Sequence, residues 1–114
     1  MKVLNLTLVA AALLVVPAAS ASTVVYGTVG PGYTITLRNA AGKTIKSLPH
    51  GVVVFKIRDR SSDHDFHLTG KGVDRSTEVA QKGAFTWRLT LKPGRYTYKC
   101  DPHEIIMIGH FTVV

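Results

Sequence analysis

The sequence predicts an all-β protein, built as a two-sheet antiparallel β-sandwich with Greek-key connections. From Ser22 onward, apolar and polar residues alternate with a period of two, which is typical of strands with one buried face. Turn-forming stretches rich in Gly, Pro and Asn divide these runs about every eight to twelve residues. No stretch of convincing length after Ser22 has a helical period.

Residues 1–21 are expected to be an export signal that is not part of the fold. Lys2 precedes an apolar run, Val3–Val16, and Ala19-Ser20-Ala21 has the small-residue pattern that a signal peptidase needs. The run is shorter than the roughly 20 apolar residues that span a bilayer, which favours cleavage after Ala21 over an uncleaved membrane anchor. The mature domain would be residues 22–114, exported to the periplasm or the extracellular space.

The first expected strand is 23–28, a β-rich run that ends before the turn Gly30-Pro31-Gly32. Residues 33–38 alternate next, and the pattern places Tyr33 on the buried face together with the apolar residues after it. Asn39–Gly42 then closes a hairpin, in which the glycine can supply the positive φ that such a loop requires.

The middle of the chain contains the strongest strand signal. After an expected strand at 43–48 and a turn at 49–51, Val52–Asp59 alternates clearly between apolar and charged residues. Residues 64–68 begin another extended piece. Gly70–Ala84 is irregular and is expected to be a long connection that crosses between the sheets.

The last part of the domain alternates again. Residues 86–91 form an expected strand, and Lys92–Arg95 suits a type II turn with Pro at its second position and Gly at its third. In 96–100 the inward face includes Cys100, and 111–113 is the final strand. The aromatic residues of this region are expected to pack in the core; they are Trp87, Tyr96, Tyr98 and Phe111.

The loop after the 96–100 strand carries three side chains that suit a redox-active metal. Cys100 is the only cysteine in the chain, His103 follows three residues later, and Met107 lies four beyond that. A thiolate, an imidazole and a thioether are the ligands that copper prefers. A lone thiol in an oxidising compartment also needs a reason to exist, and metal ligation is one. The alternative is a buried thiol, a surface histidine and a core methionine.

A copper site of this kind needs a second histidine from elsewhere in the chain. Both His64 and His67 come after the strongest strand, whose end can lie beside the end of the Cys100 strand. The two histidines are an odd number of residues apart, so in an extended chain they face opposite sides and only one can point into the site.

Two stretches resemble the halves of a cupredoxin copper site, as in plastocyanins and amicyanins. They are His64-Asp65-Phe66-His67-Leu68 and the run from Tyr96 to Met107, and the similarity extends over about 33–114. The resemblance implies one copper ion in a type 1 site, with His64, Cys100 and His103 as trigonal ligands and Met107 as the weak axial ligand. The family usually has Asn after its first ligand, whereas this chain has Asp65.

The other histidines have simpler interpretations. His67 is expected to be structural or partly buried, His50 to be exposed in a turn, and His110 to point outward from the last strand.

The resemblance implies a one-electron carrier, not an enzyme, whose electrons pass through the exposed edge of His103. Ile105, Ile106 and Ile108 either form an apolar docking patch around that edge or pack within the loop. An alternative with the same ligands is an extracytoplasmic copper-binding or shuttling protein without an electron-transfer role. Multicopper enzymes need further histidine clusters that this chain does not have, and a metal-free wall-associated sandwich would leave Cys100 unexplained.

The mature chain is basic. Without Lys2, thirteen of the fourteen Lys and Arg residues face seven Asp and Glu, a formal charge of +6. The positive residues are scattered, with no dense run and no interleaved aromatics, which argues against nucleic-acid binding. The expected partner is an acidic redox protein, with attraction to anionic membrane or wall surfaces as a second consequence of the charge. The domain is expected to be a monomer.

Overall fold

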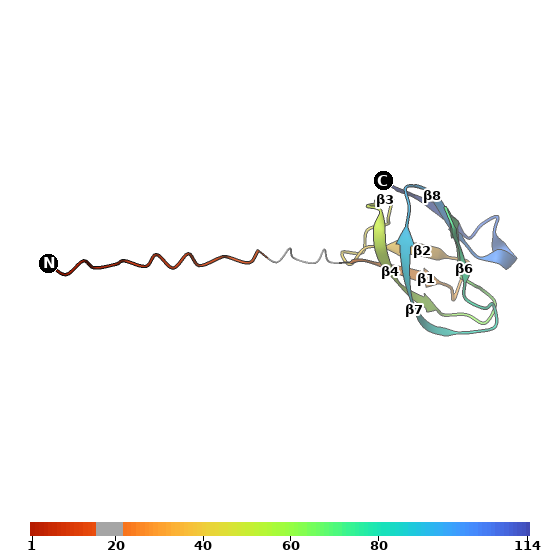
Figure 1. Ribbon diagram of the computed structural model, residues 1–114. Coiled ribbons are helices and arrows are strands. Elements are labelled where there is room, and N and C mark those ends of the chain that lie inside the picture. Colours follow the sequence, from red (N-terminus) through yellow and green to blue (C-terminus); the bar gives the residue numbers. More distant parts are fainter. Residues whose placement is uncertain (16–21) are drawn as a thin grey trace.

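The computed structural model describes residues 1–15 and 22–114, and the second range folds into two facing β-sheets (Figure 1). One sheet has the strand order β2-β1-β4-β7, and the other has the order β3-β9-β8-β5-β6. The strands are β1 (Thr23–Val29), β2 (Ile35–Arg38), β3 (Ser47–Leu48), β4 (Gly51–Asp59), β5 (His67–Gly70), β6 (Val73–Ser76), β7 (Gly83–Leu91), β8 (Gly94–Lys99) and β9 (Ile108–Val113). A 3₁₀ turn, η1 (Asp101–His103), lies between β8 and β9. The predicted all-β, two-sheet sandwich is confirmed.

The sheets are mixed, although the prediction was antiparallel. β1 runs parallel to β4, with Val25 opposite Phe55, and β3 runs parallel to β9. The other strand pairs of the two sheets are antiparallel. The β1–β4 pairing joins two segments that are separated in sequence by β2 and β3, and local alternation carries no information about it.

Several local predictions were wrong. The expected strand at 43–48 is reduced to β3. The segment 70–84 is not one long connection, because β6 forms a hairpin with β5 and β7 begins at Gly83. β6 lies at a sheet edge with three of its four side chains exposed, so it has no buried alternation to detect. Tyr33 is exposed instead of buried. The N–H of Gly30 donates to the carbonyl of Thr34 at 2.9 Å, and this closed loop keeps Tyr33 outside β2.

The core forms where the inward faces of the two sheets meet. In β4 the inward residues Val53, Phe55 and Ile57 are buried, while Lys56 and Arg58 are exposed. Burying an apolar side chain of this size stabilises the folded state by about 1.5–3 kcal/mol. The four aromatic residues predicted to be core are buried, and two stacked ring pairs lie in the interior: Phe66 on Tyr98 at 5.8 Å, and Tyr96 on Phe111 at 5.3 Å.

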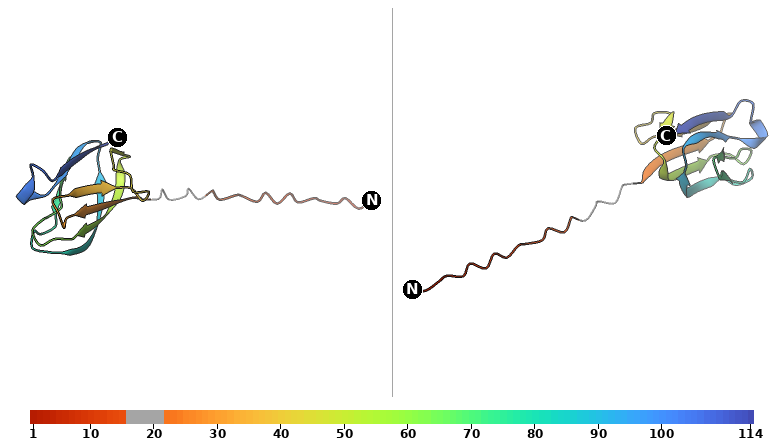
Figure 2. Two further views of the ribbon diagram at one scale, coloured as in Figure 1. Left: turned by 180° about the vertical axis from the view of Figure 1, so that it is seen from behind. Right: turned by 45° about the horizontal axis from the view of Figure 1, so that its top comes forward.

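The Cys100–Met107 loop lies at the end of the sandwich away from the start of β1, as seen from both sides (Figures 1 and 2). Residues 1–15 are exposed and contain no helix or strand. The predicted cleavage motif Ala19–Ala21 lies outside the described residues. In the part of the chain that the structure describes, no helix has the length and apolar character needed to cross a membrane.

Candidate metal centre

The connection between β8 and β9 is a tight loop whose two ends are hydrogen-bonded to each other. The N–H of Cys100 donates to the carbonyl of Met107 at 3.0 Å, and the N–H of Met107 donates to the carbonyl of His103 at 2.9 Å. Inside the loop, η1 begins directly after Cys100 and contains Pro102 in its first turn, where a missing N–H does no harm. These contacts hold Cys100 and His103 in a fixed relation.

The upstream ligand is positioned by a second set of local contacts. After β4, the carboxylate of Asp59 accepts the N–H of Ser61 at 3.0 Å, and the hydroxyl of Ser61 accepts the N–H of Asp63 at 3.0 Å. The chain therefore turns at 62–63 and brings His64, only 3% exposed, under the end of the sandwich. β5 does not begin until His67, so the alternation argument that separated the two histidines assumed a strand that is not there. His64 nevertheless lies in the donor cluster with Cys100 and His103, and His67 does not.

A backbone-to-side-chain hydrogen bond ties the two ligand segments together. The Asp101 N–H donates to Oδ1 of Asp65 at 2.6 Å. The residues on either side of this bond, His64 and Cys100, are both predicted ligands. The first strand pairing beyond it, His67 with Lys99, continues the same alignment into β5 and β8.

The donor atoms of three predicted ligands converge on one point. Nδ1 of His64 and Nδ1 of His103 are 3.1 Å apart, and they lie 3.6 Å and 3.7 Å from Sγ of Cys100. In protein zinc sites, imidazole nitrogen and thiolate sulfur lie about 2.0 and 2.3 Å from the ion, which separates trigonal donors by about 3.5–3.8 Å. The two distances to Sγ match these values, and the distance between the two Nδ1 atoms is somewhat shorter. The cluster is the size of a site for one metal ion, and a thiolate combined with imidazoles favours copper among the common ions.

The electrostatics of Cys100 also fit a bound cation. Burial raises the pKa of the Cys100 thiol, although hydrogen bonds from the backbone N–H groups of Asp65 and His103 act in the opposite direction. A thiolate at this buried position needs a positive charge beside it. A metal ion supplies that charge and displaces the thiol proton on binding.

Met107 is fully buried, and its backbone is hydrogen-bonded to the backbone of both Cys100 and His103. Its place in the core cluster is compatible with packing as well as with ligation. Its assignment as the weak axial ligand stays a prediction.

His67 belongs to a separate network beside the donor cluster. Its Nδ1 contacts both carboxylate oxygens of Asp101 at 2.8 and 2.9 Å, and its Nε2 contacts Oδ1 of Asp74 at 2.6 Å. Burial acts to lower the pKa of His67, but these two carboxylates outweigh it and raise that pKa. Burial, together with a side-chain hydrogen bond to Asp101, raises the pKa of Asp65 to about 6. The prediction that His67 is structural fits this arrangement.

The remaining histidines lie at the surface, as predicted. Nδ1 of His50 contacts the carbonyl of Val114 at 2.8 Å, and Nδ1 of His110 contacts the hydroxyl of Thr97 at 2.9 Å. Both are exposed, and neither approaches the donor cluster.

Sequence reasoning missed one neighbour of the metal centre. The ring of Tyr33 lies 5.7 Å from the ring of His64 and 5.0 Å from that of His103. The turn Gly30-Pro31-Gly32 was a visible signal for a loop, but the contact of that loop with the ligands is non-local.

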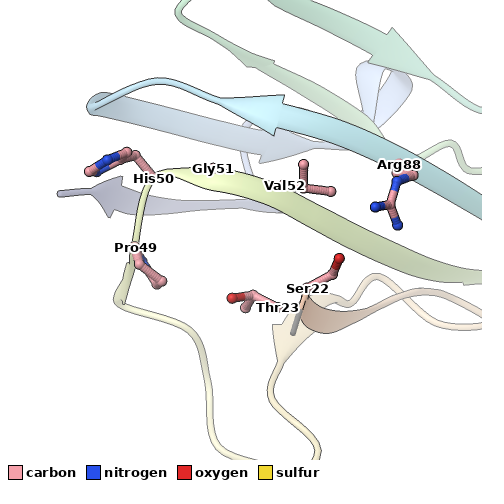
Figure 3. A pocket seen from close by; sticks show the side chains of 7 residues that line it. All are labelled: Ser22, Thr23, Pro49, His50, Gly51, Val52 and Arg88. Carbon is pink, nitrogen blue, oxygen red and sulfur yellow. The ribbon is translucent and has the colours of Figure 1, made fainter. Parts of the chain in front are cut away.

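A cavity of about 530 Å³ lies at the far end of the sandwich (Figure 3). It is lined by Ser22, Thr23, Pro49, His50, Gly51, Val52 and Arg88. β4 begins at this cavity and ends near the metal cluster, a span of roughly 26 Å at about 3.3 Å per residue. The cavity therefore contributes no group to the metal centre.

Comparison with known proteins points to the same chemistry. The profile of copper binding proteins of the plastocyanin/azurin family matches residues 22–114. No curated protein sequence matches the chain significantly. Among solved structures, rusticyanin from Thiobacillus ferrooxidans is similar with a TM-score of 0.63 and 18% identity, covering 84% of this chain and 79% of that one. Auracyanin A, a "blue" copper protein from the green thermophilic photosynthetic bacterium Chloroflexus aurantiacus, has a TM-score of 0.57 and 13% identity over 82% of this chain and 100% of that one. At these identities the two structures support the fold.

Proposed function

The chain belongs to the plastocyanin/azurin family of copper-binding proteins, and on that premise we propose that it is an exported one-electron carrier with a single copper ion. The observation that carries the proposal is the convergence of two Nδ1 atoms and one Sγ atom within 3.7 Å of one another. Bound copper supplies the chemistry, a one-electron change between Cu(II) and Cu(I).

The protein's part is to hold the donors in one arrangement and keep water away from them. His64 and Cys100 are buried, and the hydrogen-bonded loop from Cys100 to Met107 fixes His103 relative to the sulfur. Burial and the loop hydrogen bonds restrict the movement of the donors, so a change of charge at the centre requires little movement of the chain. Small reorganisation of this kind favours fast electron exchange.

His103 is the ligand best placed to pass electrons to a partner. It is partly exposed, whereas His64 is not. Beside it, Asp101–Ile106 line a hollow of about 500 Å³, and Ile105 and Ile106 are 91% and 62% exposed. This exposure favours the docking patch over the alternative of loop packing. The charge of Glu104 within the patch is paired with Nζ of Lys99 at 2.8 Å.

The copper site is tested by the visible spectrum of the purified domain, residues 22–114, after addition of Cu(II). We expect an intense band from charge transfer between thiolate and copper, which is absent in Cys100→Ser. A colourless wild-type protein with an intact thiol would contradict the proposal.

Electron transfer is tested separately, because a copper-shuttling protein would have the same ligands. A carrier is expected to exchange electrons reversibly with a small redox reagent and to keep its metal through repeated cycles. Loss of copper on each reduction would favour the shuttle.

Export is part of the proposal and is supported by the apolar run, the small-residue motif and the single thiol. The partner is proposed to be an acidic redox protein. The domain itself is proposed to be a monomer. Expression of the full chain and mass analysis of the exported fraction test the first point, and the expected mature N-terminus is Ser22. A retained protein that still carries residues 1–21 would overturn it.

A further inference from the structure

Three rings meet at the outer side of the metal centre, and only two of them belong to ligands. The ring centroids of His64 and His103 lie 4.9 Å apart, and Tyr33 lies 5.7 Å from the first and 5.0 Å from the second. The interplanar angles are 64°, 75° and 76°, so every pair meets edge to face. Attractive aromatic contacts have this geometry and these separations.

The loop that presents Tyr33 is fixed directly against His64. Besides the bond from Gly30 to Thr34, the N–H of Arg60 donates to the carbonyl of Val29 at 2.9 Å, which ties the start of the loop to the segment that leads to His64. The backbone at Gly30 approaches so closely that a Cβ there would lie 3.0 Å from Cδ2 of His64. The position of Tyr33 over the ligands is therefore built into the fold.

Core packing does not explain this placement. Tyr33 is 64% exposed, and its ring meets those of His64 and His103 edge to face. A flat ring with only two rotatable side-chain bonds can restrict the motion of its neighbours at low entropic cost. Removing it would uncover the adjoining side of His103 and take away one of the contacts that restrict the two imidazole rings.

We propose that Tyr33 is a positioning residue that closes the solvent side of the metal centre. Its ring keeps both Nδ1 atoms aimed at the same point and hinders the approach of competing ligands from solvent. Tyr33 thereby slows the release of the metal ion. This inference rests on the proposed copper site and adds a residue that controls how long that site keeps its ion.

The test is the rate at which excess EDTA removes Cu(II) from the loaded domain, monitored by the loss of the thiolate-to-copper band. Tyr33→Ala is expected to release copper about 10-fold faster, the usual scale for removing a residue that orients a metal ligand. Tyr33→Phe keeps the ring and should restore a rate within about twofold of wild type. Tyr26→Ala, an exposed tyrosine on β1, is the matched control and should leave the rate unchanged.

A second readout separates positioning from a general loss of stability. The Cu(II) electron paramagnetic resonance spectrum of Tyr33→Ala should differ from wild type, because the imidazoles are less restricted, while the melting temperature of the metal-free variant stays close to wild type. Tyr33→Leu repeats both measurements with a bulky apolar side chain that has no aromatic ring. Two outcomes would overturn this inference and leave the proposed copper site standing. In the first, Tyr33→Ala has the release rate and the spectrum of the wild type. In the second, Tyr33→Phe releases copper as fast as Tyr33→Ala. A wild-type chain that takes up no copper would overturn the proposed function with it.

Discussion

The carboxyl group of Asp65 joins the two segments that carry the metal ligands, in a position where the family usually has an amide. Its Oδ1 accepts the Asp101 N–H at 2.6 Å. An Asn side chain has the same acceptor atom, so this tie does not require a carboxylate. The carboxylate adds a buried acidic group beside the sulfur of Cys100.

Asp65→Asn is therefore expected to keep the metal and change its redox properties. Removing a negative charge next to the ion favours Cu(I) over Cu(II) and should raise the reduction potential, on the order of 50 mV. Electrochemistry of the loaded protein measures the shift, and a Cu(II) titration serves as the control for metal binding. If the affinity for copper collapses instead, Asp65 is needed to build the site and is not merely a tuning residue.

His67 makes the stability of the metal-free protein depend on pH. Its imidazole faces Asp101 and Asp74, with Asp65 close by, and its pKa is raised above the ordinary histidine value of 6.5. Because the folded protein holds this proton more tightly than the unfolded chain does, the stabilisation is fully present below pH 6.5 and is lost as the pH rises through the folded-state pKa.

His67→Gln should consequently lower the free energy of unfolding more at pH 5.5 than at pH 9. The difference is expected to be about 0.5–1 kcal/mol, since the carboxylates are partly exposed and screened by solvent. Urea unfolding of the metal-free wild type and variant at both values gives the comparison, and His110→Gln is the matched control. An equal cost at both pH values would show that the ion pairs contribute nothing.

At the scale of elements, two glycines allow tyrosine rings of β8 to lie flat over the neighbouring strands. A Cβ at Gly109 of β9 would collide with the ring of Tyr98, and a Cβ at Gly70 of β5 would collide with the ring of Tyr96. These two tyrosines form the stacked pairs at the centre of the core. β8 leads directly into Cys100, so the packing of its rings also anchors the ligand loop.

Gly109→Ala is expected to destabilise the domain by about 1–3 kcal/mol, the typical cost of forcing an extra carbon into a packed interior. Gly32→Ala is the control, because a Cβ at Gly32 meets nothing within 4 Å. That substitution should be neutral or slightly stabilising, since alanine restricts the unfolded chain. Thermal unfolding of the metal-free forms tests both, and equal melting temperatures would contradict the packing argument.

How far the sequence predicts these elements depends on burial. β4, β7, β8 and β9 each bury one face, and their alternation was visible in the residues. β6 was missed because an exposed edge strand has no buried face to mark it. The ligand loop was found because its three side chains lie within eight residues, whereas the contact of Tyr33 with two histidines joins three separate segments and leaves no local pattern.

The same limit applies to the whole molecule. The site forms because β4 and β8 end at one pole of the sandwich and a bond from Asp101 to Asp65 aligns the two ligand segments there. Periodicity predicts both strands but not their common end, and the choice of His64 over His67 came from resemblance to a family. The parallel pairing of β1 with β4 is equally invisible, because it depends on the path of the chain through β2 and β3.

The net charge is a property of the whole domain, and it should control the rate at which the carrier reacts with small charged redox reagents. Near His103 the charges are largely paired, Glu104 with Lys99 and Asp101 with His67, so the formal +6 of residues 22–114 dominates at long range. At about 0.01 M salt, where the Debye length is about 30 Å, an anionic oxidant such as ferricyanide should be attracted by the entire molecule. Its rate with the reduced protein is expected to fall about 10-fold by roughly 0.5 M salt, because screening removes the steering.

A cationic cobalt phenanthroline complex is the matched control, and its rate should rise over the same range. Stopped-flow measurements that show no salt dependence for either reagent would mean that local pairing around His103 outweighs the net charge, and the expectation of an acidic partner would lose its support.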